Sequence, residues 1–213
     1  MMMNDPTEGV ITRISEWVIN MALLNLYWVI FTLAGGIVFG WAPALAALMT
    51  VQKRQLQDRE RFPVFKAMAM EFRKNFLKAN GIGAVLALAA LLLVFYSFTL
   101  TQWDGFLMLV FFAAFLVIAI VVTMVTIFIF PVFVYYDQSF LGYFKYALIV
   151  GISHFHYVLM LAVTLAVIGW GYAFFPGALL AFGASFPAMC AMHLSLKVFT
   201  KIQQKQELYA AME

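Results

Sequence analysis

Few side chains in the apolar segments of this sequence could carry chemistry. Its three histidines, His154, His156 and His193, are the residues there that could hold a metal ion or move a proton. Residues two apart on one helix point about 200° away from each other, so His154 and His156 do not form a two-ligand metal site by themselves. No Asp, Glu, Lys or Arg falls in the middle of an apolar segment, and coupling sites of ion-driven transporters usually need one. We therefore expect structural or interfacial histidines and no ion-coupled transport.

Sequence motifs of the common enzyme classes are also missing. The chain has no GxSxG, no HExxH and no P-loop, and its paired glycines, such as Gly35-Gly36, follow no strand. Cys190 is the only cysteine in the sequence, which excludes a disulfide framework and a cysteine-based metal site. We therefore expect no enzymatic activity, with no catalytic residue, no bound metal and no cofactor.

A few polar residues inside the apolar segments could instead line a path for a small solute. The candidates are Asn20, Asn25, His154 and His156. A facilitator or channel for sugars or oligosaccharide fragments therefore stays open as an alternative function.

The composition defines the environment in which these residues lie. Of 213 residues, 65% are hydrophobic and 11% are charged, whereas a soluble domain has about 45–50% and about 25%. Four runs carry no charged residue: Trp17–Gln52, Ala79–Trp103, Gly105–Tyr136 and Tyr146–Leu196. An apolar stretch longer than about 18 residues is a candidate transmembrane helix. The predicted fold class is all-α, a polytopic transmembrane helical bundle that forms a single integral membrane domain.

These runs divide the domain into three expected helical hairpins. They occupy about residues 10–57, 80–136 and 145–200, with a basic segment at 58–80 and a cytoplasmic tail at 201–213. The last run must hold two spans, because a bilayer takes roughly 20 helical residues, and we expect its turn near Gly169–Gly177. The run before it carries one span plus an excess that begins near Pro131.

The first run is too long for one upright helix and short for two. Three glycines between positions 35 and 40 weaken a helix there, and Pro43 favours the first turn of a new one. We expect a full span over Trp17–Leu33 and a short second helix over Pro43–Arg54. If that helix crosses or re-enters the membrane, the N-terminus is cytoplasmic; if not, there are five spans and an external N-terminus. The sequence alone therefore predicts either five or six membrane helices.

A short internal similarity favours the hairpin alternative. Residues 39–47 and 182–191 share Phe-Gly, then Pro-Ala and a further Ala, and each stretch runs on to basic residues. A same-sense repeat would make the first and last hairpins equivalent.

The basic residues are concentrated between particular spans. Eight lie in one segment: Lys53, Arg54, Arg59, Arg61, Lys66, Arg73, Lys74 and Lys78. The tail and the turn at 137–145 hold further lysines, whereas the turns at 101–105 and 170–177 have no Lys or Arg. Because Lys and Arg favour cytoplasmic loops, we expect a cytoplasmic C-terminus and, with three hairpins, a cytoplasmic N-terminus.

The spacing over Pro63–Asn80 predicts an amphipathic helix on the inner membrane surface. Apolar residues recur on one helical face, and basic residues fall on the others. Such a helix is typical of an interfacial anchor held by anionic lipid, and the alternative is a docking element for a partner. The residues expected to contact lipid or partner are Lys66, Phe72, Arg73, Lys74, Phe76 and Lys78.

Several of these stretches together resemble the YesL-like family of bacterial membrane proteins. The resemblance is carried by Leu24–Trp28, by the break at 39–48, by Lys53-Arg54 and by Phe72–Asn80. It implies a multi-span protein of the bacterial plasma membrane without an established biochemical activity. It also implies an association, through gene neighbourhood, with carbohydrate uptake systems and glycan-degrading enzymes.

The function that we predict is that of a non-enzymatic accessory membrane protein tied to carbohydrate uptake. The expected partners are the lipid bilayer and either subunits of an ABC-type sugar importer or a second copy of the chain. No nucleic-acid partner is expected, because the basic residues lie between spans, where cytoplasmic loops carry them.

Overall fold

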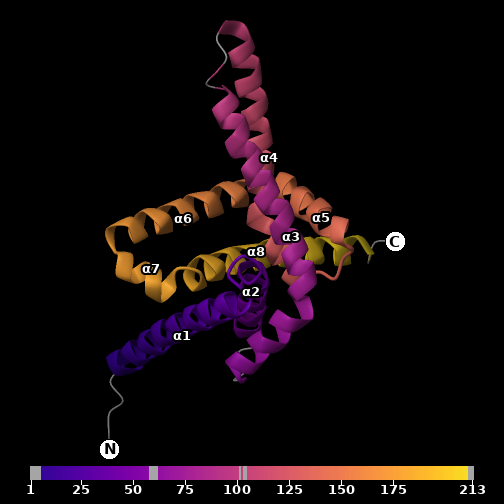
Figure 1. The fold of residues 1–213 in the computed structure, drawn as a ribbon. Helices are drawn as coiled ribbons and strands as arrows, with labels where there is room; N and C mark the ends of the chain where they lie inside the picture. Colours follow the sequence, from indigo (N-terminus) through magenta and orange to yellow (C-terminus); the bar gives the residue numbers. More distant parts are fainter. Residues whose placement is uncertain (1–5, 58–61, 101, 103–104, 211–213) are drawn as a thin grey trace, which may run out of the picture.

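The computed structural model describes residues 6–57, 62–100, 102 and 105–210 (Figure 1). Its helices are α1 (Pro6–Ala34), α2 (Trp41–Gln57), α3 (Val64–Leu100), α4 (Gly105–Tyr135), α5 (Phe140–Ser153), α6 (Phe155–Phe174), α7 (Pro176–Phe182) and α8 (Ser185–Ala210). Over these residues every regular element is a helix, which confirms the predicted fold class. Arg59 and Arg61 of the basic segment, and Trp103 and Asp104 of the expected turn, lie outside the described residues.

Four of the described helices are long and apolar enough to cross a membrane: α1, α3, α4 and α6. A fifth span is added if α7 and α8, which are bent by 61° at a short break, count as one broken helix. With that broken helix the total reaches five, the lower end of the expected five to six, and α2, with only 17 residues and a basic and polar end, is too short to count as a sixth.

The centre of the molecule is α2, which packs against α1, α3, α4 and α8. It begins at Trp41, two residues before the predicted start, with Pro43 in its first turn. Four of its buried residues are alanines, so neighbouring helices approach its backbone closely. On α3, a Cβ added to Gly83 would lie 2.8 Å from the Cβ of Ala42. The small residues of α2 therefore serve close helix packing in the core.

A helix break is present in the predicted place at 35–40, and a second one in the similar stretch at 182–191. Between α1 and α2 the chain turns at 35–40, with Gly36 at φ 76° and Ile37 at φ 60°. A Cβ on Gly40 would lie 2.1 Å from the carbonyl oxygen of Thr32, so only glycine fits there. The second break, at 183–184, separates α7 from α8. The two similar stretches of sequence thus stand at equivalent places, each leading into a helix with basic residues towards its C-terminal end.

The structure corrects the expected surface helix. The segment from Val64 to Asn80 is not a separate element, since α3 continues without interruption to Leu100. Its apolar face packs on protein: Met68 is fully buried, and the Phe72 ring lies 5.3 Å from that of Phe31 on α1. The apolar face that was expected to contact lipid therefore packs largely against other helices in the core.

The structure defines two further boundaries more closely than the sequence. Helix α4 passes through Pro131 without a break and ends at Tyr135. Helix α6 continues through the expected turn residues at 169–172 and ends at Phe174, so the turn is confined to Phe175.

The helices form two groups around α2. Helices α6, α7 and α8 make a hairpin that packs beside α1, as Figure 1 shows. The α3–α4 hairpin is the other group, and its tip stands clear of the remaining helices. Large apolar side chains are exposed there over residues 88–98 and 106–121. Such a surface is typical of a segment that faces lipid.

Candidate functional site

A polar cavity of about 380 Å³ lies where the basic end of α2 and the basic first turns of α3 meet the end of α4. Its lining comes from the end of α2, the first turns of α3, the end of α4 and the start of α5: Thr50, Lys53, Arg54, Glu71, Lys74, Asn75, Lys78, Phe133, Val134, Tyr135, Tyr136, Asp137 and Tyr143. Four of these residues are basic and two are acidic. We refer to it as the basic cavity.

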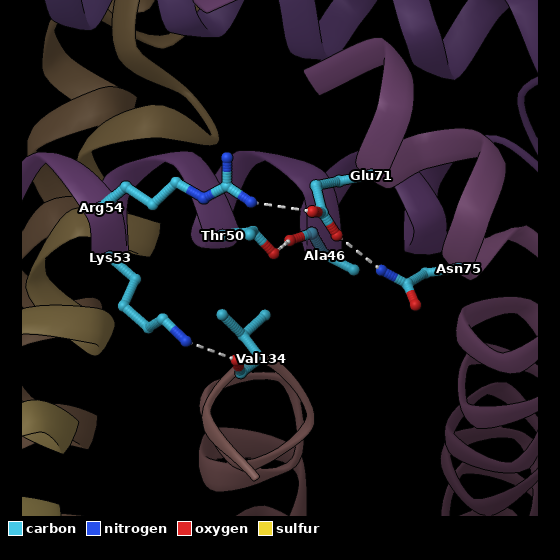
Figure 2. Close-up of polar contacts among 7 residues, drawn as sticks. All are labelled: Ala46, Thr50, Lys53, Arg54, Glu71, Asn75 and Val134. Atoms are coloured by element: carbon cyan, nitrogen blue, oxygen red, sulfur yellow. Dashed lines mark hydrogen bonds and ion pairs between the residues drawn. The ribbon is translucent and has the colours of Figure 1, made fainter. Parts of the chain in front are cut away.

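Lys53 connects the wall formed by α2 to the end of α4. Its Nζ donates a hydrogen bond to the carbonyl oxygen of Val134 over 2.9 Å (Figure 2). The same Nζ lies 5.5 Å from the centre of the Tyr135 ring. The last carbonyls of a helix have no partner within it, and a cation is favourable at that end. Lys53 therefore caps α4 and fixes the distance between the two walls.

Glu71 connects α2 to α3. Arg54 Nη2 lies 3.0 Å from Glu71 Oε1, and Asn75 Nδ2 donates to Glu71 Oε2 over 3.0 Å, as Figure 2 shows. Both oxygens of this carboxylate are thus engaged, and it balances the charge of Arg54. Lys74 and Lys78, one helical turn apart on α3, have no ion pair with the described residues. The net positive charge of the cavity therefore resides on its lysines.

Tyrosines close the cavity at the end of α4. The Tyr135 hydroxyl donates to Gln203 Oε1 over 2.8 Å and so joins α4 to α8. The Tyr143 hydroxyl accepts from the backbone N–H of Gln138. Burial, together with Tyr135 and Tyr146 nearby, raises the pKa of Tyr136. Its hydroxyl is consequently neutral at physiological pH and available as a hydrogen-bond donor. Lysines combined with neutral donors can bind an anion.

The predicted contact residues fall into three groups. Lys74 and Lys78 line the basic cavity, while Lys66 and Arg73 are exposed on α3 without lining it. Phe72 and Phe76 pack against each other, with ring centres 5.4 Å apart, and belong to the core and its edge. The structure thus separates basic residues that share a cavity from basic residues that only face outward.

The two asparagines that could line a solute path hold helices together instead. Asn20 and Gln55 exchange two hydrogen bonds, of 3.2 and 3.3 Å, between α1 and α2. Asn25 is buried; its Nδ2 donates to the carbonyl of Leu180 over 2.7 Å, and its Oδ1 accepts from the N–H groups of Ala184 and Ser185. Asn25 therefore satisfies the backbone at the break between α7 and α8.

The histidines lie elsewhere, and their geometry corrects the expectation. His154 sits between α5 and α6, where the helix is interrupted. Its ring centre is 6.3 Å from that of His156, so the two rings are neighbours and do not point in opposite directions. Both belong to the start of α6, near Tyr157 and Lys201. Among the described residues they do not join the asparagines in one path, and His193 is exposed on α8.

A second cavity, of about 590 Å³, is open and mostly apolar. It lies between the two helix breaks, with Trp28, Trp41 and Gly183 in its lining. The Nε1 of Trp28 is buried and has no hydrogen-bond partner among the described residues.

The sequence reasoning missed much of the basic cavity. In the sequence, Lys53 and Arg54 were used only to predict which side of the membrane is cytoplasmic. Glu71, Asn75 and the Tyr135–Asp137 stretch were assigned no role. A usable signal existed, because the run that ends in Tyr-Tyr-Asp and the basic end of α2 were both expected on the same side of the membrane.

The fold and this site define a class, that of all-α, multi-span proteins with a basic cavity at one end. Residues 21–98 match the family described as "Protein of unknown function, DUF624". The chain is 31% identical to the uncharacterized protein YteU of Bacillus subtilis (strain 168), over 95% of this chain and 91% of that protein. Two similar proteins of the same organism are YesV, 30% identical over 88% and 90%, and YesL, 28% identical over 97% and 98%. The chain therefore belongs to the DUF624 family of YesL-like proteins, and no solved structure matches it significantly.

Proposed function

We propose that this chain is a non-enzymatic accessory protein of the bacterial plasma membrane that acts by binding other membrane components. The observation that carries this proposal is that the polar residues inside the apolar segments do not line one common path. Asn20 and Asn25 hold helix contacts, and the histidines lie at a separate helix junction. This arrangement favours a binding protein over a facilitator, which needs its polar groups along one path.

We further propose a carbohydrate uptake system as the partner, with subunits of an ABC-type importer as the binding proteins. The support for the uptake system is the family resemblance, which implies such an association. The surface that such a partner would contact, in place of lipid, is the tip of the α3–α4 hairpin, whose apolar side chains are not covered by the rest of the chain.

The proposed orientation places the basic cavity and both termini in the cytoplasm. Lys53 links the end of α2 to the end of α4, and Tyr135 links α4 to α8. The basic end of α2 and the part of α8 that carries lysines therefore lie together around the end of α4, and an excess of Lys and Arg favours the cytoplasmic side.

Co-purification tests the proposed partner. The tagged chain would be cross-linked in its native membrane, solubilised in mild detergent and recovered with whatever is attached. We expect permease subunits of a sugar importer, and slower uptake of the matching sugar in a strain that lacks the gene. Recovery of the chain alone, with unchanged uptake, would contradict the proposal.

Liposomes that contain only the purified chain provide the second test. Because no solute path is proposed, sugar flux into these vesicles is expected to equal that of protein-free vesicles. Flux well above that level would replace the accessory role with a facilitator.

A further inference from the structure

We propose that the basic cavity binds the phosphate group of an anionic phospholipid from the cytoplasmic leaflet, through Lys74, Lys78 and Lys53. The proposal concerns a lipid and does not rest on the identity of a protein partner.

The first step concerns charge. Glu71 is occupied by Arg54 and Asn75. With Asp137 as the second acidic residue of the lining, four basic residues against two acidic ones still leave the cavity with a net positive charge. Lys74 and Lys78 lie on the same wall, and Lys53 faces them from α2 with its ammonium group held at the end of α4. Three ammonium groups around one cavity match a phosphate, which each of them contacts as a point charge.

The second step concerns depth in the bilayer. The apolar run of α3 starts directly after Lys78 and continues to Leu100, so these 22 residues span about 33 Å as a helix. A hydrocarbon core is about 30 Å thick. If the turn after Leu100 lies at one boundary of the core, Lys78 lies at the other, which is where lipid phosphates are found.

The end of α4 supports the same depth. Its apolar run finishes at Tyr135, beside the cavity, and Tyr136 and Tyr143 add two further phenol rings to the lining. Tyrosine favours the level of the lipid head groups. Basic pockets between transmembrane helices on the cytoplasmic side bind anionic head groups. The depth therefore favours a lipid phosphate over a phosphate dissolved in the cytoplasm.

The test measures lipid binding to the purified full-length chain. The chain in neutral detergent is titrated with phosphatidylglycerol or phosphatidylcholine, and the bound lipid is counted by native mass spectrometry. We expect phosphatidylglycerol to bind preferentially. The double variant Lys74→Gln/Lys78→Gln should bind it about thirtyfold more weakly, since each lysine near the membrane surface contributes roughly fivefold.

Matched variants separate the cavity from general surface charge. Lys66→Gln/Arg73→Gln removes the same charge from the same helix outside the cavity and should change binding less than about threefold. Lys74→Arg/Lys78→Arg keeps the charge and should retain the preference, which guards against loss of binding through misfolding. Equal losses in the two glutamine variants would overturn the proposal.

Inorganic phosphate distinguishes the two sources of the anion. At millimolar concentration it should leave bound phosphatidylglycerol in place if the site is a lipid site. Displacement of the lipid by inorganic phosphate alone would assign the cavity to a soluble anion and overturn the lipid proposal. Because no partner protein is present, neither result depends on the outcome of the co-purification.

Discussion

At the scale of single residues, Asn25 shows why a polar group can be placed in the interior of an apolar chain. A helix break buried at membrane depth leaves backbone groups that water cannot reach, and each costs several kcal/mol if it stays unpaired. The side chain of Asn25 pairs three such groups at 180–185. Gln52 of α2 pairs a fourth, the carbonyl of Ser185, over 2.7 Å. The break between α7 and α8 is therefore held from α1 and α2.

The first prediction follows from this role. Asn25→Ala should lower the free energy of unfolding by about 2–4 kcal/mol, because it removes three hydrogen bonds and leaves buried groups unpaired. Asn20→Ala, on the same helix, should cost about 1 kcal/mol, since its bonds to Gln55 lie in a less buried place. Denaturant unfolding in detergent micelles compares the two variants. Equal losses would show that Asn25 has no special role at the break.

The second prediction concerns Glu71 and the charge of the basic cavity. Glu71→Gln should strengthen phosphatidylglycerol binding about fivefold, because it removes the carboxylate that balances Arg54. The loss in stability should stay at about 1 kcal/mol, since the Arg54 side chain is 41% exposed and glutamine can keep the hydrogen bond between Glu71 and Asn75. Native mass spectrometry and denaturant unfolding measure the two effects. Unchanged or weaker lipid binding would contradict the charge balance described for the cavity.

At the scale of elements, close packing of α2 depends on residues without bulk. The third prediction is that Gly83→Ala destabilises the protein by about 1–3 kcal/mol, because its Cβ would overlap Ala42 and press on Trp41. Gly169→Ala on α6 is the control: its Cβ would meet open space, and alanine favours a helix over glycine by about 1 kcal/mol. Thermal unfolding in detergent should separate them, and a neutral Gly83→Ala would argue against tight contact between α2 and α3.

The elements also show how far the fold could be predicted from the sequence. Runs without charge located α1, α3, α4 and α6, because hydrophobic length alone determines a span. Glycines at 35–40 located the first break, and the second break lies in the stretch around Gly183 that is similar to it in sequence. The continuity of α3 could not be predicted, because an amphipathic segment followed by an apolar one can bend or continue. Packing of Met68 and Phe72 on the core determines which happens.

The candidate site was predictable only in part, for a related reason. Lys74 and Lys78 follow from the charge pattern of one helix, and both line the cavity. The contributions of Lys53 and Tyr136 depend on contacts between residues about 80 positions apart. The interruption at His154 is a backbone feature without a glycine or proline to indicate it. Hydrophobic periodicity describes one helix at a time, so it does not predict contacts between helices that are far apart in the sequence.

At the scale of the whole molecule, the distribution of charge defines two ends. Lys53 and Tyr135 tie together the basic end of α2, the end of α4 and the part of α8 that carries lysines. The opposite end of the α3–α4 hairpin, around Gln102, carries no Lys or Arg in the sequence. An insertion that follows the positive-inside rule puts these two ends in different compartments.

The fourth prediction tests this orientation with single cysteines. Cys190→Ser removes the native thiol, and Gln102→Cys, Lys66→Cys and Gln204→Cys then place one exposed thiol in each region of interest. A membrane-impermeant maleimide should label Gln102→Cys in intact cells and the other two only after the membrane is permeabilised. Labelling of Lys66→Cys in intact cells would reverse the orientation and remove the basic cavity from the cytoplasmic leaflet.

A reporter fused to the N-terminus completes the same experiment. A signal from the cytoplasm means that the chain crosses the membrane an even number of times before α3 begins, so α1 and α2 together return to the side on which α1 started. Since α2 is covered by four helices and offers little surface to lipid, it can return through the protein interior although it is shorter than a full span. A periplasmic signal would instead leave α1 as the single crossing of this region and α2 as a buried helix near the cytoplasmic side.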